Sequence, residues 1–266
     1  DMPLSIKDGT KENGIDGKKG EVEFRNVSFC YPDAEKDVIE DISFTAHKGE
    51  TIAFIGSTGC GKSTVINMIP RFYDVTGGSI SINGVDVRDV TQNELRSHIG
   101  YVPQQSILMS GTIASNISYG NEDLSEDEMK EVAVTAQSLD FIEEKEDGFK
   151  SEISQGGSNV SGGQRQRLTI ARALVRKPRI LILDDSASAL DFATDAALRK
   201  TIREMKNAPT VFIVSQRTSS IRFADQILVL DDGKSVGVGT HDELLTTCSV
   251  YKEIYDSQYK KSGKEA

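Results

Sequence analysis

The chain has 266 residues, of which 37% are hydrophobic and 27% charged, so it can form one large packed domain or two small ones and is not expected to be disordered throughout. Its formal net charge of −10 argues against a surface that coats nucleic acid, so we expect no nucleic-acid partner. No apolar run is long enough for a membrane-spanning helix, and three scattered cysteines indicate reduced thiols in a cytosolic setting.

The first hundred residues predict an arm followed by several short strands. Residues 1–20 are rich in glycine and charge, which is typical of a linker or mobile arm. From Glu21 the segment EVEFRNVSFCY alternates apolar and polar residues, as a half-buried strand does. DISFTAH and ETIAFIG repeat the pattern, and GGSISINGVDV reads as a hairpin that turns at Asn83-Gly84.

Helical signals then dominate. The segments Thr91–Glu94 and Ser125–Glu128 have the spacing of a capping box. Residues 125–145 predict one or two amphipathic helices, and Gln164–Val175 predicts another that ends before Pro178.

The last third alternates buried strands with helices. ILIL and TVFIV are continuous apolar runs, and residues 192–206 between them predict a helix. ILVLDDG predicts a strand and turn, and Thr240–Glu243 is expected to cap a last helix with one apolar face. Apolar strands that alternate with helices indicate a parallel sheet covered on both faces. We therefore predict an α/β core with an N-terminal antiparallel β layer and an inserted α-helical lobe at about residues 105–176.

The segment GSTGCGKST, residues 56–64, matches the phosphate-binding pattern G-x-x-x-x-G-K-[ST] in full. It follows the apolar run TIAFI and opens a helical segment, which disfavours the alternative of a plain glycine-rich turn. Glycines let backbone N–H groups surround a phosphate, the lysine adds a charge, and the serine hydroxyl suits Mg²⁺. The candidate nucleotide-binding residues are Gly56, Ser57, Thr58, Gly59, Cys60, Gly61, Lys62, Ser63 and Thr64.

The run ILILDD ends in two acids, Asp184 and Asp185. An apolar strand that ends in an acid can place a carboxylate beside a metal-bound nucleotide. The alternative for Asp184 is a buried acid that caps a helix.

Together with these two motifs, VSGGQRQRLTIARAL (residues 160–174) resembles the signature of ATP-binding-cassette (ABC) proteins. In spacing, the chain is most similar to the nucleotide-binding domain of an ABC exporter, over residues 21 to about 245. The resemblance implies a P-loop NTPase core that binds ATP and Mg²⁺. It also implies a domain over residues 21–258, preceded by a linker (1–20) from a membrane domain and followed by a flexible tail (259–266).

The resemblance also implies roles at matching positions. Tyr31 would stack on adenine, although a tyrosine packed in the sheet is the alternative. Gln104 would reach Mg²⁺ together with Ser63 and Asp184, and would sense the membrane domain. The turn formed by Ser161, Gly162, Gly163 and Gln164, together with Asp191, would close over the nucleotide of an opposing domain rather than its own.

Two positions depart from the family pattern. Asp185 stands where relatives carry the glutamate that polarises the attacking water, and its carboxylate is withdrawn by roughly 1.5 Å. Gln216, after TVFIVS, stands where a histidine contacts the γ-phosphate, and glutamine cannot carry its positive charge. Because a misplacement of ~1 Å can cost about a hundredfold in rate, we expect ATP binding with weak or negligible turnover. The pattern resembles the degenerate half of a heterodimeric, multidrug-type exporter, whose partner chain would carry the glutamate and histidine.

We thus expect an ATP hydrolase of the ABC transporter type at the cytoplasmic face of the cell membrane, paired with a second nucleotide-binding domain and a transmembrane domain. Two alternatives stay open at this point: a soluble ABC-type ATPase outside transport, and a nucleotide-dependent regulatory clamp. The apolar residues Ile107, Leu108, Met109 and Ile113 suit either docking of a membrane domain or packing within the helical lobe. The transported substrate would be chosen by membrane helices and is not encoded here.

Overall fold

The computed structural model describes residues 6–12, 15, 20–32, 34–121, 123–186 and 188–259. The expected arm (1–20) is therefore described only in part, and the expected tail lies outside the described residues apart from Tyr259. None of the described helices is both long and apolar enough to cross a membrane.

A six-stranded sheet in the order β12-β11-β3-β10-β9-β6 forms the centre of the molecule. All neighbouring strands in it are parallel except β12, which pairs antiparallel with β11. Its strands are β3 (Thr51–Gly56), β6 (Ile99–Val102), β9 (Ile180–Asp184), β10 (Thr210–Val214), β11 (Gln226–Asp231) and β12 (Lys234–Gly239).

A second, antiparallel sheet in the order β2-β1-β4-β5 is built from the N-terminal part of the chain. Its strands are β1 (Val22–Phe29), β2 (Ile39–Ala46), β4 (Gly77–Ile82) and β5 (Val85–Asp86). The predicted turn joins β4 to β5, with Asn83 and Gly84 both at positive φ, as a two-residue hairpin requires. The two shortest strands, β7 (Gly111–Thr112) and β8 (Glu152–Ile153), pair with each other.

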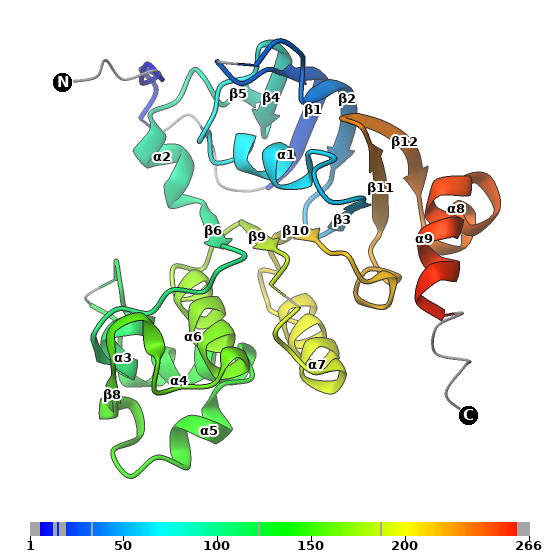
Figure 1. The fold of residues 1–266 in the computed structure, drawn as a ribbon. Helices are drawn as coiled ribbons and strands as arrows, with labels where there is room; N and C mark the ends of the chain where they lie inside the picture. Colours follow the sequence, from blue (N-terminus) through cyan, green and yellow to red (C-terminus); the bar gives the residue numbers. More distant parts are fainter. Residues whose placement is uncertain are drawn as a thin grey trace.

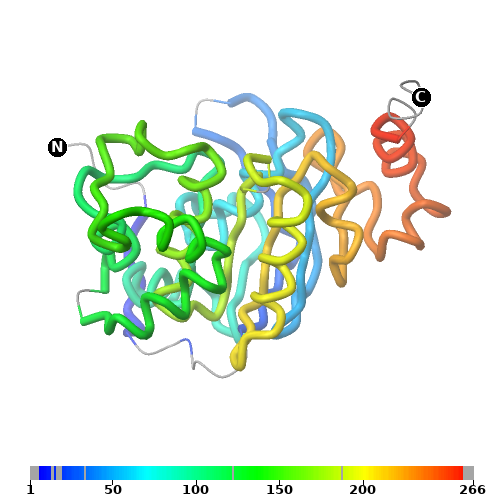
Figure 2. The backbone as a smooth tube through the Cα atoms, turned by 90° about the horizontal axis from the view of Figure 1, so that it is seen from below, coloured from blue at the N-terminus to red at the C-terminus, as the bar shows by residue number. Residues whose placement is uncertain are grey.

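Helices lie around the two sheets, and the helical lobe projects from one side of them (Figure 1). Figure 2 shows this lobe, in green, on the side of the molecule opposite the last two helices, in orange and red. The helices are α1 (Lys62–Met68), α2 (Gln92–Ser97), α3 (Ile113–Ile117), α4 (Glu126–Thr135), α5 (Leu139–Glu143), α6 (Gly162–Leu174), α7 (Phe192–Arg203), α8 (His241–Thr247) and α9 (Ser249–Tyr259), with short 3₁₀ turns at Gly148–Lys150, Gln155–Gly157 and Thr218–Ser220.

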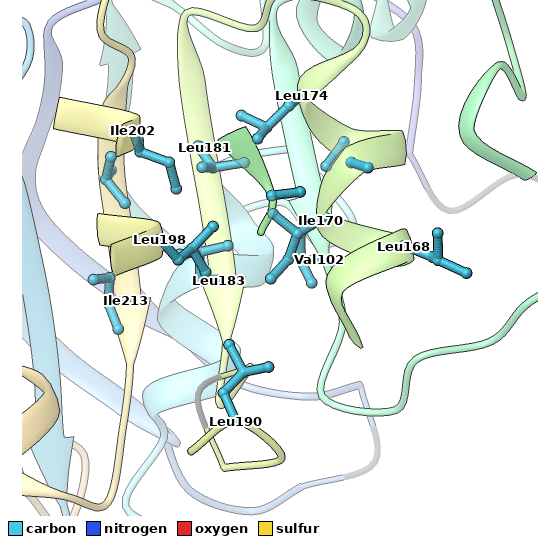
Figure 3. Packing of buried hydrophobic residues seen from close by; sticks show 14 of the residues in the cluster. Val102, Leu168, Ile170, Leu174, Leu181, Leu183, Leu190, Leu198, Ile202 and Ile213 are labelled. Carbon is cyan, nitrogen blue, oxygen red and sulfur yellow. The ribbon is translucent and has the colours of Figure 1, made fainter. Parts of the chain in front are cut away.

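Both faces of the parallel sheet are buried, which explains its continuous apolar strands. Ile52 and Phe54 of β3 pack in one core with α1 and the antiparallel sheet, whereas Ala53 and Ile55 pack in a second core with α6, α7 and the lobe. In Figure 3 the side chains of β9 lie between those of α6 and α7. The labelled members of this second core are Val102, Leu168, Ile170, Leu174, Leu181, Leu183, Leu190, Leu198, Ile202 and Ile213. The predicted fold class, an α/β core with an antiparallel layer and an inserted helical lobe, is confirmed.

Several element boundaries differ from the prediction. The segment 125–145 forms two helices, α4 and α5. The apolar stripe predicted as one last helix is divided between α8 and α9, because Cys248 takes an extended backbone conformation between them. Thr91 accepts a hydrogen bond from the Glu94 N–H at the start of α2, but Glu94 bonds His98 with its side chain instead of completing a capping box.

The described part of the expected arm packs against the molecule. Arg71, which is buried, donates from Nη2 to the Lys7 carbonyl at 2.8 Å. The Gln92 N–H at the start of α2 donates to Asp8 Oδ1 at 2.7 Å. Residues 6–12 thus lie across the connection between the antiparallel sheet and α2.

Candidate functional site

The phosphate-loop sequence joins β3 to α1 at the carboxyl end of the parallel sheet. Gly56 and Gly61 have φ of 155° and 99°, in the region that favours glycine. A Cβ at Gly56 would lie 2.0 Å from the Leu230 carbonyl oxygen, and one at Gly61 would lie 2.4 Å from Ile39 Cδ1. Both the backbone conformation and the close packing of neighbouring strands therefore require glycine at these positions.

Lys62 places its ammonium group within the loop. Its side chain is buried, and Nζ donates to the carbonyls of Gly56 at 2.9 Å and Ser57 at 2.6 Å. The positive charge also acts to lower the pKa of Asp184 and of Asp185. The loop thus carries a cation close to two carboxylates, and α1 begins at this same residue.

Asp184, the last residue of β9, is bound to the loop through Ser63. Ser63 Oγ donates to Asp184 Oδ1 at 3.0 Å, and the Tyr101 hydroxyl lies 3.4 Å from Oδ2. Only 6% of Asp184 is exposed, and this burial raises its pKa although both hydroxyls favour the ionised form. Tyr101 also donates to Asn67 Oδ1 on α1 at 2.8 Å, so the hydroxyl joins α1, β6 and β9.

Asp185 lies one residue beyond the strand, with φ at 44°. Aspartate and asparagine adopt this left-handed region more readily than other non-glycine residues. Its N–H donates to the Val214 carbonyl at 3.0 Å. Burial raises the pKa of Asp185, while the charges of Arg217 and Lys62 and a hydrogen bond from the Gln104 side chain act to lower it. Asp185 therefore lies between the segment that carries Gln104 and the end of β10.

Gln216 follows β10, which lies between β3 and β9 in the sheet. The Ser215 N–H donates to the Phe54 carbonyl of β3 at 3.2 Å. Gln216 itself is exposed, and its carbonyl accepts a hydrogen bond from Gln258 Nε2 at 2.7 Å. The end of β10 is thus at the same edge as the loop and Asp185.

Tyr31 lies next to the phosphate loop. Its hydroxyl is 3.1 Å from Thr64 Oγ1, and its ring packs edge-on against Phe29 and Tyr73 with centroids 4.8 Å and 5.3 Å away. The side chain is half-buried, so it both packs beside the sheet and presents surface near the loop. This position is compatible with either role considered for it from the sequence.

The predicted signature turn lies apart from the phosphate loop. Ser161 caps α6 and forms a reciprocal capping box with Gln164, and both Ser161 and Gly162 are exposed. Asp191 caps α7 by accepting from the Thr194 N–H at 2.9 Å, which lowers the pKa of its exposed carboxylate. Within the described ranges, no hydrogen bond or ion pair joins these residues to residues 56–64.

The residues of the loop fit a nucleotide with its magnesium ion. Glycine backbone, a helix start and a buried lysine are suited to phosphate oxygens. In the part of the chain that the structure describes, no cluster of three or more His, Cys, Asp or Glu side chains could hold a metal by itself. Mg²⁺ commonly takes one or two protein oxygens together with phosphates and water. The contact between Ser63 Oγ and Asp184 Oδ1 supplies such a pair.

Sequence reasoning missed two residues at this site, Tyr101 and Arg217. Tyr101 lies in β6, three residues before Gln104, and Arg217 directly follows Gln216. The signal available was the shared sheet edge: side chains just before or after the carboxyl ends of parallel strands gather at one crevice.

Comparison with known proteins gives consistent matches. The family model described as "ABC transporter" matches residues 39–188. An uncharacterised ABC transporter ATP-binding protein of Mycobacterium tuberculosis is 46% identical over 246 residues, which are 91% of this chain and 42% of that protein. A putative multidrug export ATP-binding/permease protein of Staphylococcus aureus is 41% identical over 258 residues, 97% of this chain and 45% of that protein.

Among solved structures, a bacterial Atm1-family ABC exporter with ATP bound superposes with a TM-score of 0.91 at 36% identity, over 96% of this chain and 45% of that chain. The present chain thus spans less than half the length of each of these relatives.

Proposed function

This chain belongs to the ABC transporter family, and from that premise we propose that it is the ATP-binding module of an exporter and holds ATP with Mg²⁺ at residues 56–64. We assign the nucleotide-binding domain to residues 21–258 and its helical lobe to about 105–176. Residues 1–20 would lead from a transmembrane domain, which places the module at the cytoplasmic face of the membrane. Support comes from the multidrug export relative and from the superposition on an exporter with ATP bound.

In this proposal, the backbone amides of the loop and Lys62 bind the phosphates, and Tyr31 stacks against the adenine. Ser63, Asp184 and Gln104 would hold Mg²⁺, which supplies neutralisation of the phosphate charge when bound. Tyr101 orients the Asp184 carboxylate through its hydroxyl. These residues explain binding, and none of them is a general base.

We further propose that this site binds ATP but hydrolyses it weakly, and one observation carries that proposal. The carboxylate after Asp184 belongs to the short side chain of Asp185, whose backbone N–H donates to the Val214 carbonyl of β10. A general base must lie within hydrogen-bond reach of its water, and the missing methylene shortens that reach. At the end of β10 the neutral Gln216 cannot supply the charge of a histidine.

The exposed signature turn would act on a second nucleotide-binding domain. Ser161, Gly162, Gly163 and Gln164 begin α6, and the capping box uses the N–H groups of Ser161 and Gln164 only. The N–H groups of Gly162 and Gly163 at this helix start favour an anion. They are not joined to their own phosphate loop, so we assign them, with Asp191, to the nucleotide of a partner chain. That partner would carry the glutamate and histidine that this chain lacks.

ATP binding and turnover by the chain, measured over a wide range of protein concentration, test this function. We expect Mg-ATP binding with almost no turnover at any concentration. The double variant Asp185→Glu with Gln216→His should raise turnover by about a hundredfold, because it restores the reach of the base and a group that can be charged. Lys62→Ala is the matched control, which should lose nucleotide binding.

Brisk turnover by the unsubstituted chain that rises faster than linearly with concentration would refute the impaired-site proposal. It would mean that two copies form a working pair of sites with Asp185 and Gln216 in place. Failure to bind Mg-ATP at all would refute the ATP-binding function itself.

A further inference from the structure

The C-terminal helix α9 makes three hydrogen bonds to the segment that follows β10, all through one side chain. Gln258 Oε1 accepts from both the N–H and the hydroxyl of Thr218, each at 2.9 Å. Gln258 Nε2 donates to the Gln216 carbonyl at 2.7 Å. An amide has one oxygen acceptor and one nitrogen donor, and the two backbone groups fix which end points to which residue.

The segment that Gln258 holds is next to the nucleotide-binding loop. Val214 pairs with Phe54 of β3 on one side and with Asp184 of β9 on the other. The backbone of Asp185 is bonded to Val214, and the charge of Arg217 acts on the Asp185 carboxylate. Ser215 also donates to the Phe54 carbonyl of β3, the strand that leads into the phosphate loop, so a displacement of residues 215–218 changes the surroundings of Asp185.

The contact is built into the fold on both sides. Thr218 is fully buried, so its N–H and hydroxyl need an acceptor inside the protein, and Gln258 is that acceptor. On the other side, α9 is anchored by Tyr251, which is also fully buried and whose hydroxyl lies 2.8 Å from His241 Nδ1. Gln258 thus extends from a fixed helix to a segment that otherwise runs along the surface at Gln216 and Arg217.

We propose that Gln258 is a positioning residue for nucleotide discrimination: it fixes the backbone of residues 216–218 so that the Gln216 side chain is directed at the outermost phosphate of ATP. This inference rests on the proposed function, because it uses the same nucleotide site. It assigns a role in distinguishing ATP from ADP to α9, which lies about forty residues after Gln216 in the chain. Gln258 itself does not touch the nucleotide.

The test uses two Gln258 variants, one control variant and two readouts, with the unsubstituted 266-residue chain as the reference. In Gln258→Ala, amide hydrogen exchange in peptides covering residues 213–220 should accelerate roughly tenfold, since the buried Thr218 donors lose their acceptor. The ratio of Mg-ATP to Mg-ADP affinity should fall roughly fivefold, with ADP affinity unchanged, because one hydrogen-bonded contact is lost. Ser257→Ala is the matched control: among the residues that the structure describes, its hydroxyl bonds only the Ile254 carbonyl within α9, so neither readout should change.

Gln258→Glu separates positioning from stability. Glutamate still accepts from Thr218, so exchange at the Thr218 amide should stay slow, but it cannot donate to the Gln216 carbonyl. We therefore expect the fall in the ATP-to-ADP affinity ratio to persist in this variant.

An exchange rate in Gln258→Ala equal to that of Ser257→Ala would overturn the positioning role. So would an equal loss of ATP and ADP affinity, which is the result of a merely structural contact. Absence of Mg-ATP binding by the unsubstituted chain is a separate result: it overturns the proposed function, and the exchange comparison still decides whether Gln258 holds the segment.

Discussion

Asp184 illustrates how single residues at the site are placed for binding rather than for stability. Its carboxylate is almost fully buried at the end of β9, with two hydroxyls as partners and a neighbouring acid in Asp185. Burying a charge is unfavourable unless a counter-charge compensates it. Burial raises the pKa of Asp184, so the folded protein binds a proton at this carboxyl more readily than the unfolded chain does.

Asp184→Asn should therefore stabilise the ligand-free chain. It should also abolish the dependence of ATP binding on Mg²⁺. We expect the free energy of unfolding to rise by about 1 kcal/mol at pH 7, because a buried charge is removed and an amide of the same shape remains. The affinity for ATP should no longer increase when Mg²⁺ is added. Denaturant unfolding and titration with ATP in the presence and absence of Mg²⁺ measure the two effects.

The difference in free energy of unfolding between Asp184→Asn and the unsubstituted chain should depend on pH in a defined direction. Because the folded pKa of Asp184 lies above its unfolded value, its favourable contribution is complete below about pH 4 and is lost as the pH rises through the folded value. The advantage of Asp184→Asn should accordingly be largest near neutrality and vanish in acid. An advantage that grew on acidification would contradict the assignment of burial as the cause.

At the scale of elements, the connection from β3 to α1 is constrained by its backbone conformation and by its neighbours. Gly59 and Gly61 both have positive φ, at 85° and 99°. A Cβ at Gly59 would have no atom within 4 Å, whereas one at Gly61 would collide with Ile39 and lie 3.2 Å from the Val38 carbonyl oxygen. The two glycines therefore share a backbone requirement but differ in packing.

This difference predicts unequal effects of alanine at the two positions. Gly59→Ala should lower the free energy of unfolding by about 1–2 kcal/mol through backbone strain alone. Gly61→Ala should lower it by about 1–3 kcal/mol more, because the buried Ile39 side chain must move to admit the methyl group. Chemical denaturation of the ligand-free variants checks this order, and equal losses would show that strain alone decides both.

At the scale of the whole molecule, the chain presents two separate parts of a nucleotide site. The phosphate loop lies at the edge of the parallel sheet, whereas the signature turn begins α6 in the helical lobe, exposed and unconnected to that loop within the described residues. In the proposed function each part is completed by another domain. The isolated chain should therefore bind nucleotide without help from its own signature turn.

Gly162→Asp tests this separation. A Cβ at Gly162 meets no atom within 4 Å, and an acid in the first turn of a helix is favourable, so the fold should be retained. In dilute solution the affinity for Mg-ATP should equal that of the unsubstituted chain, as measured by fluorescence titration. A clear loss of affinity in the dilute variant would mean that the turn serves its own loop.

Features that depend on local backbone chemistry were readable from the sequence alone. The phosphate loop is specified by glycines, a lysine and a serine at fixed spacing between a strand and a helix, and the structure has that strand and helix in place. The buried strands were predicted because both faces of the sheet are covered, which makes their residues continuously apolar. Ser125 forms the predicted capping box with Glu128 at the start of α4, because this pairing depends on residues three apart.

Only the tertiary structure decided which distant residues meet at the site. Tyr101 reaches Asp184, and Gln258 holds Gln216, across long separations in sequence that leave no periodic or spacing signal. The break between α8 and α9 was equally hidden, since the apolar stripe continues through Cys248 while the backbone does not remain helical. Local patterns fix what each segment can form, but the neighbours of a side chain depend on how β6, β9, β10 and α9 pack together, and that packing is a property of the whole chain.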